Sequence, residues 1–245
     1  MKADPQAQRR LLDVQAIDTA LGQLEHKRRN MPEHAELDKL ARELSALEDE
    51  RVRAQVGVDD YDRDIARLEK DVDQVRARAA KDQSRLDVGT GPARELEAIQ
   101  HELGTLKRRQ NELEDAELEL MEKREEAQGV LDEVEQRLTS VREKRDDVQR
   151  RRDEILANVE RDVEFRRSGR APLVADLPGD LIALYEKIRE QTGIGAALLR
   201  GGRCEGCRLE LSGQEKSRVR VAAADDVYRC DECGRILVRT EESGL

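Results

Sequence analysis

Apolar residues recur at alternating spacings of three and four along most of this chain. One series begins at Leu37 and continues to Leu86, and a second runs from Leu96 to Val159. Polar members weaken the second series in places, but its register is kept. Heptads sustained over this length are typical of α-helices that bury a narrow stripe against a partner helix. The pattern therefore predicts two long coiled-coil helices.

The amino-acid composition also favours narrow packing over a wide globular core. Of the 245 residues, 41% are charged and only 2% are aromatic, with no Trp and a single Phe. A high content of Ala, Glu, Lys, Arg and Leu with heptad spacing indicates long helices. The net charge is −10, so binding to nucleic acid would need a local basic surface rather than the chain as a whole.

The short segment between the two heptad series predicts a turn. Gly89 and Gly91 can end one helix, and Pro92 is tolerated in the first turn of the next. Because a short connection favours antiparallel neighbours, residues 1–165 are predicted to form an antiparallel hairpin with its tip near 88–92. An earlier apolar set is out of phase with the first series, and Pro32 predicts a break or kink near residue 32.

Residues 166–194 differ in character from the coil. Gly169 and Pro172 predict a linker or extended segment over 166–177. Pro178 then predicts the start of a short helix, which Gly193 should end. We therefore expect a hinge and a short helix between the hairpin and the C-terminal domain.

All four cysteines lie in the C-terminal segment, residues 195–245, as two Cys-x-x-Cys pairs separated by 22 residues. Four thiolates from two such tight turns suit tetrahedral Zn²⁺. Disulfides conflict with the expected reducing compartment, a thioredoxin-like motif would need a βαβ context, and an iron–sulfur centre is a weaker alternative. The predicted ligands of one structural Zn²⁺ are Cys204, Cys207, Cys230 and Cys233.

A zinc site closed by four protein ligands leaves no position for a substrate, and its binding energy is folding energy. Removal of the metal should therefore unfold residues 195–240 and leave the coil helical. Alternating β-branched residues predict short strands in this domain. These residues are Val219, Val221, Val227, Ile236 and Val238. The predicted fold class is mainly α, a long antiparallel coiled-coil hairpin followed by a small C-terminal β zinc ribbon.

Basic side chains of the hinge and the ribbon form a candidate surface for nucleic acid or a partner. Residues 166–203 contain seven basic and four acidic residues, whereas residues 200–245 contain nine of each. The alternatives are that the basic hinge caps acidic coil ends and that the ribbon charges are simply scattered. The candidate residues are Arg166, Arg167, Arg170, Arg200, Arg203, Arg208, Lys216, Arg218 and Arg220.

No sequence pattern indicates an enzyme. The three histidines, His26, His34 and His101, lie in or near the coil without a catalytic or metal motif. A two-helix coil encloses too little volume for a substrate cavity, so we expect no small-molecule substrate. The N-terminal residues lack the apolar run of a signal peptide, and no stretch is long enough to cross a membrane. We expect a cytoplasmic protein without a membrane partner.

The chain resembles the bacterial C4-type zinc-ribbon proteins with a long N-terminal helical hairpin. The resemblance rests on the paired Cys-x-x-Cys motifs, on the segment LPGDLIALYEKIR, and on the tip segment PARELEAIQHEL. The tip residues that carry it are Arg94, Glu95, Leu96, Ala98 and Gln100. It implies a coiled-coil hairpin ending in a zinc ribbon. Relatives in this family are implicated in flagellar gene control through flagellin mRNA and an alternative sigma factor, and a chlamydial relative is linked to that sigma factor and to secretion components.

Three functional hypotheses follow. The first is a non-enzymatic regulatory adaptor that binds nucleic acid, with RNA favoured over DNA, or a transcription component, through the ribbon and the basic hinge. The alternative is a protein-only coiled-coil scaffold or chaperone for a sigma factor or a secretion component. A third is a factor that enters RNA polymerase with its coil tip. The tip loop, VGTGPAR, lacks the acidic residues that such a factor needs.

Overall fold

The computed structural model describes residues 1–244 of the protein. The chain divides into two compact units, which are described separately. The ribbon unit combines residues 1–34 with the chain from residue 150 onward, and the hairpin unit comprises residues 35–149. Among the described residues, no helix has both the length and the apolar character needed to cross a membrane.

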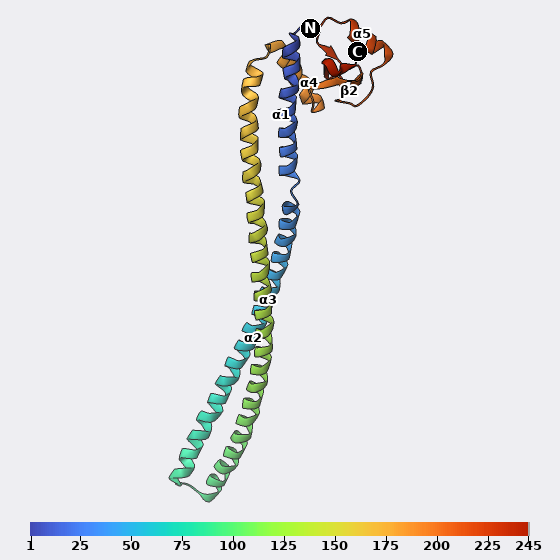
Figure 1. Ribbon diagram of the computed structural model, residues 1–245. Helices are drawn as coiled ribbons and strands as arrows, with labels where there is room; N and C mark the ends of the chain where they lie inside the picture. Colours follow the sequence, from blue (N-terminus) through green and yellow to red (C-terminus); the bar gives the residue numbers. More distant parts are fainter. Residues whose placement is uncertain (245) are drawn as a thin grey trace. The chain divides into compact units, whose positions relative to one another are not determined.

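Helices form most of the structure, and the strands are confined to the C-terminal part of the chain (Figure 1). This confirms the predicted fold class. The elements are α1 (Pro5–Arg29), α2 (Pro32–Val88), α3 (Ala93–Ala175), α4 (Gly179–Thr192), β1 (Ala196–Arg200), β2 (Arg203–Cys204), α5 (Gly213–Val221), β3 (Tyr228–Arg229), β4 (Ile236–Val238) and the 3₁₀ helix η1 (Glu241–Ser243).

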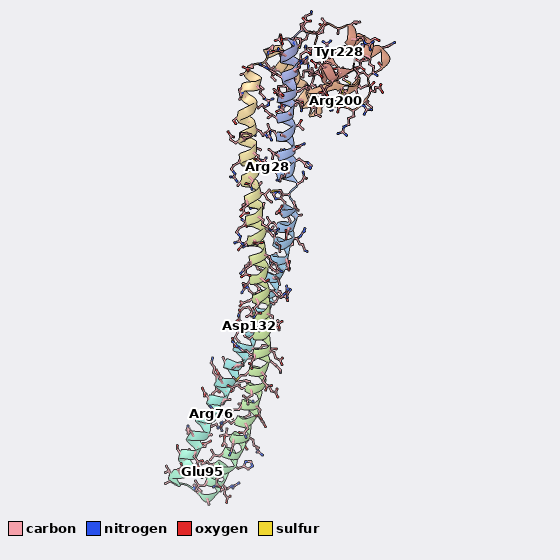
Figure 2. The ribbon with its side chains drawn as sticks, in the orientation of Figure 1. Arg28, Arg76, Glu95, Asp132, Arg200 and Tyr228 are labelled. Carbon is pink, nitrogen blue, oxygen red and sulfur yellow. The ribbon has the colours of Figure 1, made fainter. Side chains whose placement is uncertain are left out.

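In the hairpin unit, α2 and α3 lie antiparallel and bury the apolar stripe that the heptads predict. The buried cluster consists of Leu40, Leu44, Leu47, Val134, Leu138, Val141 and Val148. Ion pairs also join the two helices, such as Arg142 with Glu48 at 3.2 Å and Arg76, labelled in Figure 2, with Glu114 at 2.6 Å. Because these side chains are largely exposed, each pair contributes only about 0–1 kcal/mol. The apolar stripe therefore supplies most of the stabilisation.

The tip of the hairpin lies where the glycines and the proline predict it. Helix α2 ends at Val88 and α3 begins at Ala93. Gly89 has φ +62°, a left-handed conformation that costs glycine little, and its amide donates to the Leu86 carbonyl at 3.1 Å. Pro92 then supplies the carbonyl that accepts from the Glu95 amide at 2.9 Å.

In the ribbon unit, a break separates α1 from α2 at Asn30 and Met31, close to the predicted position. The Asn30 amide donates to the His26 carbonyl at 3.0 Å and closes the last turn of α1. Pro32 then occupies the first position of α2, where a missing N–H costs no helical hydrogen bond.

The linker predicted over 166–177 is wrong, because α3 continues as a helix to Ala175 with Pro172 inside it. The boundary predicted at residue 165 therefore falls within a helix. Pro172 lies in the last turns, where it removes a single helical hydrogen bond. Leu173 and Val174, which follow it, pack against the core of the ribbon unit. Tertiary packing of this kind outweighs the weak helix propensity of Gly169 and Pro172.

Helix α4 follows the prediction at both ends. Pro178 is its N-cap residue, and Gly193 is its C-cap in a left-handed conformation with φ +76°. The helix buries Leu181, Tyr185 and Ile188. These side chains join Leu11 and Val14 of α1, together with residues of β1 and β4, in one apolar core. The first helix of the chain is therefore part of the same core as the C-terminal sheet.

A buried carboxylate joins α1, α3 and α4 within the ribbon unit. The Asp18 side chain is only 2% exposed and accepts from Arg170 Nε at 2.7 Å and from the Tyr185 hydroxyl at 2.8 Å. Gln15 adds a second link, since its Oε1 accepts from the Gly195 amide at 2.7 Å. A buried charge is tolerated only when it is paired and hydrogen-bonded, so these partners fix how the three helices pack.

The sheet has the order β2-β1-β4-β3, with β1 and β4 parallel and the outer pairs antiparallel. Ile236 and Val238 lie in β4 as expected, but the strand predicted around Val219 and Val221 is wrong. That segment is α5. Ser212 caps this helix by accepting from the Glu215 amide at 3.2 Å. A serine three residues before a glutamate is a helix-start pattern, and it outweighs the β-branched residues that follow.

We predict that Gly195→Ala destabilises the ribbon unit by about 1–3 kcal/mol, the range for overpacking a well-filled site. A Cβ at this position would lie 2.5 Å from the Tyr185 ring and 2.6 Å from the Tyr185 carbonyl oxygen. The measurement is chemical unfolding of the zinc-loaded protein. Gly213→Ala is the matched control, because its Cβ would meet nothing within 4 Å. Equal stability of the two variants would contradict the prediction.

Candidate metal centre

Two knuckles with the same backbone pattern carry the four cysteines. The Cys204 carbonyl accepts from the Arg208 amide at 2.7 Å, and the Cys230 carbonyl accepts from the Gly234 amide at 2.8 Å. Arg208 and Gly234 occupy equivalent positions, with φ of +63° and +71°. The left-handed conformation costs glycine little but strains arginine. The same turn is therefore imposed on two different sequences.

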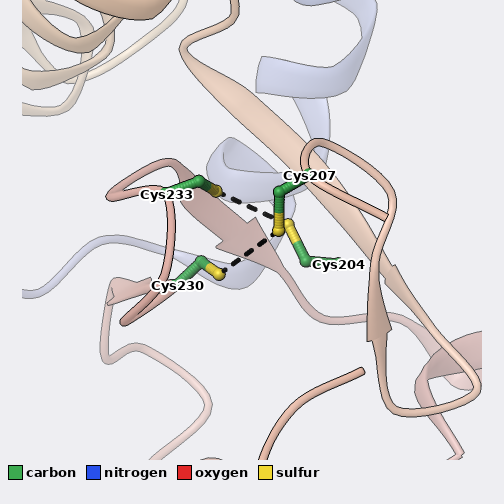
Figure 3. Close-up of side chains that lie close together, drawn as sticks. All are labelled: Cys204, Cys207, Cys230 and Cys233. Carbon is green, nitrogen blue, oxygen red and sulfur yellow. Dashed lines mark hydrogen bonds between the residues drawn. The ribbon is translucent and has the colours of Figure 1, made fainter. Parts of the chain in front are cut away.

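The knuckles bring the four sulfur atoms together (Figure 3). All four lie within 4.8 Å of one another, and the Cys204–Cys233 and Cys207–Cys230 sulfur pairs are 3.9 Å apart. A tetrahedron with Zn–S bonds of about 2.3 Å requires sulfurs about 3.8 Å apart. A disulfide requires about 2.05 Å. The donor set fits one structural Zn²⁺ held by Cys204, Cys207, Cys230 and Cys233.

The environment of the thiols determines how a metal would compete with protons. In the metal-free protein, burial raises the pKa of Cys204 to about 11 and also raises that of Cys230. Burial acts in the same direction on Cys233, but hydrogen bonds from the Arg235 amide and from the other thiols outweigh it and lower the pKa. At neutral pH two of the thiols therefore carry protons that zinc must displace.

The metal ligands are part of a small apolar cluster of their own. Its members are Ala197, Leu199, Cys204, Leu211, Val219, Cys230 and Leu237. Helix α5 reinforces this cluster. Glu215 is 2% exposed, and its Oε1 accepts from the Asp231 amide inside the second knuckle at 3.0 Å. The sequence analysis did not find this residue, although the serine–glutamate capping pattern was the signal that could have revealed it.

The N-terminal residues support the segment that precedes the second knuckle. The Ala3 amide donates to the Asp225 carbonyl at 2.8 Å, and the Val227 amide donates to the Met1 carbonyl at 3.0 Å. The Lys2 side chain also pairs with Asp225 at 3.1 Å. Sequence reasoning could not find these contacts, because they join residues more than 220 positions apart.

The nine candidate basic residues fall into two groups. Four form ion pairs with acidic residues: Arg170 with Asp18 and Glu186, Arg200 with Glu242, Lys216 with Glu210, and Arg218 with Asp231. The other five are exposed and form no ion pair within residues 1–244: Arg166, Arg167, Arg203, Arg208 and Arg220. The paired arginine on α3 is part of the packing of the ribbon unit, so it is a poor candidate for phosphate contact.

Removal of zinc is expected to expose the knuckles and α5 while the hairpin unit stays helical. The reason is that zinc ligation joins two turns that share only a small apolar cluster. Amide hydrogen exchange with and without a chelator measures the effect, and exchange should rise across residues 203–237 and stay unchanged across 35–149. Cys204→Ser should give the same pattern without chelator. Retained protection of both knuckles in the metal-free protein would contradict a structural role.

Zinc affinity is expected to rise steeply with pH around neutrality. The raised pKa values of Cys204 and Cys230 keep both thiols protonated in the metal-free protein, so loading releases at least two protons. The apparent affinity should therefore increase about 100-fold per pH unit. Competition with a chromophoric chelator at two pH values measures this slope. A pH-independent affinity would show that the thiols are already ionised before the metal binds.

Comparisons with known proteins agree with both parts of the structure. Residues 14–193 match the CT398-like coiled coil hairpin domain, and residues 203–237 match the C4-type zinc ribbon domain. An uncharacterised Mycobacterium tuberculosis protein is 37% identical over 98% of both chains. A solved Mycobacterium smegmatis structure is 36% identical, covers 98% of this chain and 100% of its own, and has a TM-score of 0.86. The structure of CT398 from Chlamydia trachomatis has the same fold at 18% identity, with 95% and 97% coverage and a TM-score of 0.65. The chain belongs to the CT398-like coiled-coil hairpin family and ends in a C4-type zinc ribbon domain.

Proposed function

We propose that this protein is a non-enzymatic adaptor that binds partner proteins along its hairpin unit, with zinc serving only to fold the ribbon. The observation that carries the proposal is the exposure of large aliphatic side chains on a hairpin whose core is a single narrow stripe. The two that lie together are Leu118 and Met121, which line one groove, whereas Val52, Val56 and Val130 are exposed outside it. Exposed aliphatic side chains that gather beside a groove indicate a docking surface rather than ordinary surface composition.

The chemistry of the metal site supports the same proposal. Four protein thiolates fill the coordination sphere of a tetrahedral zinc ion, so no position is left for a water molecule or a substrate. The knuckles are also held by backbone hydrogen bonds and a small apolar cluster. Such a centre stabilises a fold and has no means of activating a reactant. That the partner protein is a sigma factor or a secretion component stays a hypothesis.

A second candidate function is binding of nucleic acid, with RNA favoured, by the ribbon and the last turns of α3. The observation that favours it is the group of five exposed basic residues without ion pairs, among them Arg203 and Arg208 beside the first knuckle. Phosphate contacts of this kind would make binding strongly dependent on salt. The overall charge of −10 limits such binding to this local surface.

Crosslinking in cells followed by pull-down of the full zinc-loaded chain, with and without nuclease, separates the two candidates. The proposed function predicts crosslinked proteins that persist after nuclease treatment. The second candidate predicts crosslinked RNA that Arg203→Glu/Arg208→Glu reduces several-fold. The matched control is Arg42→Glu/Arg53→Glu, which reverses two exposed arginines of the hairpin unit. Loss of every protein partner on nuclease treatment would overturn the proposed function.

A further inference from the structure

The apolar seam of the hairpin unit is interrupted over several turns. On α2 no residue is buried between Val58 and Val72, and on α3 none is buried between Leu113 and Leu131. Glu117 and Arg124 occupy seam positions in this stretch. Charged residues at seam positions cannot form the apolar knobs that hold two helices in close contact.

An open groove of about 910 Å³ lies between the two helices in this interrupted stretch. Ile65 of α2 and Leu118 and Met121 of α3 supply its large apolar side chains. Leu118 is 59% exposed and Met121 is 49% exposed. These two residues lie three positions apart on one face of α3, beside the seam rather than in it. The hairpin therefore leaves an apolar strip that neither of its own helices covers.

The rim of the groove is strongly acidic. Its acidic residues are Asp62, Glu69, Glu117, Glu122, Glu125 and Asp132, the last of which is labelled on α3 in Figure 2. Arg124 is the single basic lining residue, and it is paired with Asp62 at 3.0 Å. Within residues 1–244, Glu69, Glu122 and Glu125 form no ion pair. The rim therefore carries carboxylates that the hairpin does not neutralise.

We infer that this groove binds a basic amphipathic helix of a partner protein, a conclusion that rests on the proposed adaptor function. An apolar stripe on the incoming helix would pack on Ile65, Leu118 and Met121, and its flanking Lys and Arg side chains would face the carboxylates. This is helix-in-groove recognition. The α3 lining from Leu118 to Asp132 is about 21 Å long at 1.5 Å per residue, which matches about four turns of a third helix.

The charge of the rim argues against other occupants. Nucleic acid and anionic lipid surfaces carry dense negative charge, so the carboxylates would repel both. A symmetric second copy of this chain would place the same acidic patch against itself, since a two-fold interface joins identical surfaces. Like charges facing one another across an interface are unfavourable. A cationic helix is the occupant whose charge and shape both match.

Selection from a displayed library of 20-residue helical peptides with randomised surface positions tests this inference on the full zinc-loaded chain. The enriched peptides should carry an aliphatic stripe flanked by Lys and Arg. Their affinity, measured by fluorescence anisotropy, should fall at least tenfold for Glu122→Lys/Glu125→Lys, because two favourable charge contacts become repulsive. The matched control is Glu119→Lys/Glu126→Lys, which makes the same charge change on the opposite flank of α3 and should leave affinity within twofold.

The apolar part of the inference has its own pair of variants. Leu118→Ser/Met121→Ser should weaken the enriched peptides at least tenfold, whereas Val130→Ser, also at an exposed aliphatic residue of α3 (54% exposed), should not. All of these positions are exposed, so each variant is expected to keep the helicity of the native chain. No enrichment, enrichment of peptides without basic residues, or equal effects of the groove and control variants would overturn the inference.

Two further outcomes separate this inference from the proposed function. If nuclease-resistant protein partners are captured equally by the native chain and by Glu122→Lys/Glu125→Lys, the adaptor function stands and the groove is not its docking site. If sedimentation shows that the chain self-associates and the groove variants abolish this, a second copy occupies the groove and the inference is wrong. A monomeric chain whose enriched peptides depend on the groove residues supports it.

Discussion

Zinc ligation by four thiolates is the interaction on which the C-terminal domain depends. The cluster around the knuckles contains seven buried residues, and two of them, Cys204 and Cys230, are ligands themselves. β1 and β4 also pack on α1 and α4, but the knuckles have only this small cluster, which is too little apolar surface to offset the ordering of their chain. The metal supplies the missing stabilisation and joins the loop after β2 to the loop after β3. Because four protein thiolates fill the coordination sphere, the zinc stabilises the fold and has no open position for a water molecule or a substrate.

Charge plays different parts in the two units. In the ribbon unit, Asp18 is buried and holds Arg170 and Tyr185, so an arginine that would suit phosphate binding is part of the packing instead. Such a pair is a weak net stabiliser but costly to break, because either partner alone would be a buried unpaired charge. In the hairpin unit the ion pairs are exposed and weak. The main effect of its surface charges is to attract or repel charged molecules that approach the hairpin.

The hairpin unit shows how a coiled coil can expose aliphatic side chains beside a groove without losing its fold. Its buried cluster, from Leu40 to Leu47 against Val134 to Val148, holds one end of the unit together. Polar residues at the seam positions of Glu117 and Arg124 remove apolar contacts in the middle. The cost is local, since each heptad packs mainly with its direct neighbours. The result is a strip of exposed aliphatic side chains between carboxylates.

The sequence by itself determined the features that depend on local pattern: the two heptad series, the tip at the glycines, helix α4 between Pro178 and Gly193, and the four zinc ligands. Spacing along the chain is enough for these, because heptads, caps and Cys-x-x-Cys turns act over a few residues. Only the tertiary structure decided that α3 continues through Pro172, that α5 replaces a strand, and that the first residues pair with the segment near Asp225. The course of α3 and the N-terminal pairing depend on contacts between residues distant in sequence, which override local propensity. For α5 a local cap at Ser212 was present in the sequence, and the structure decided between it and the competing β-branched residues.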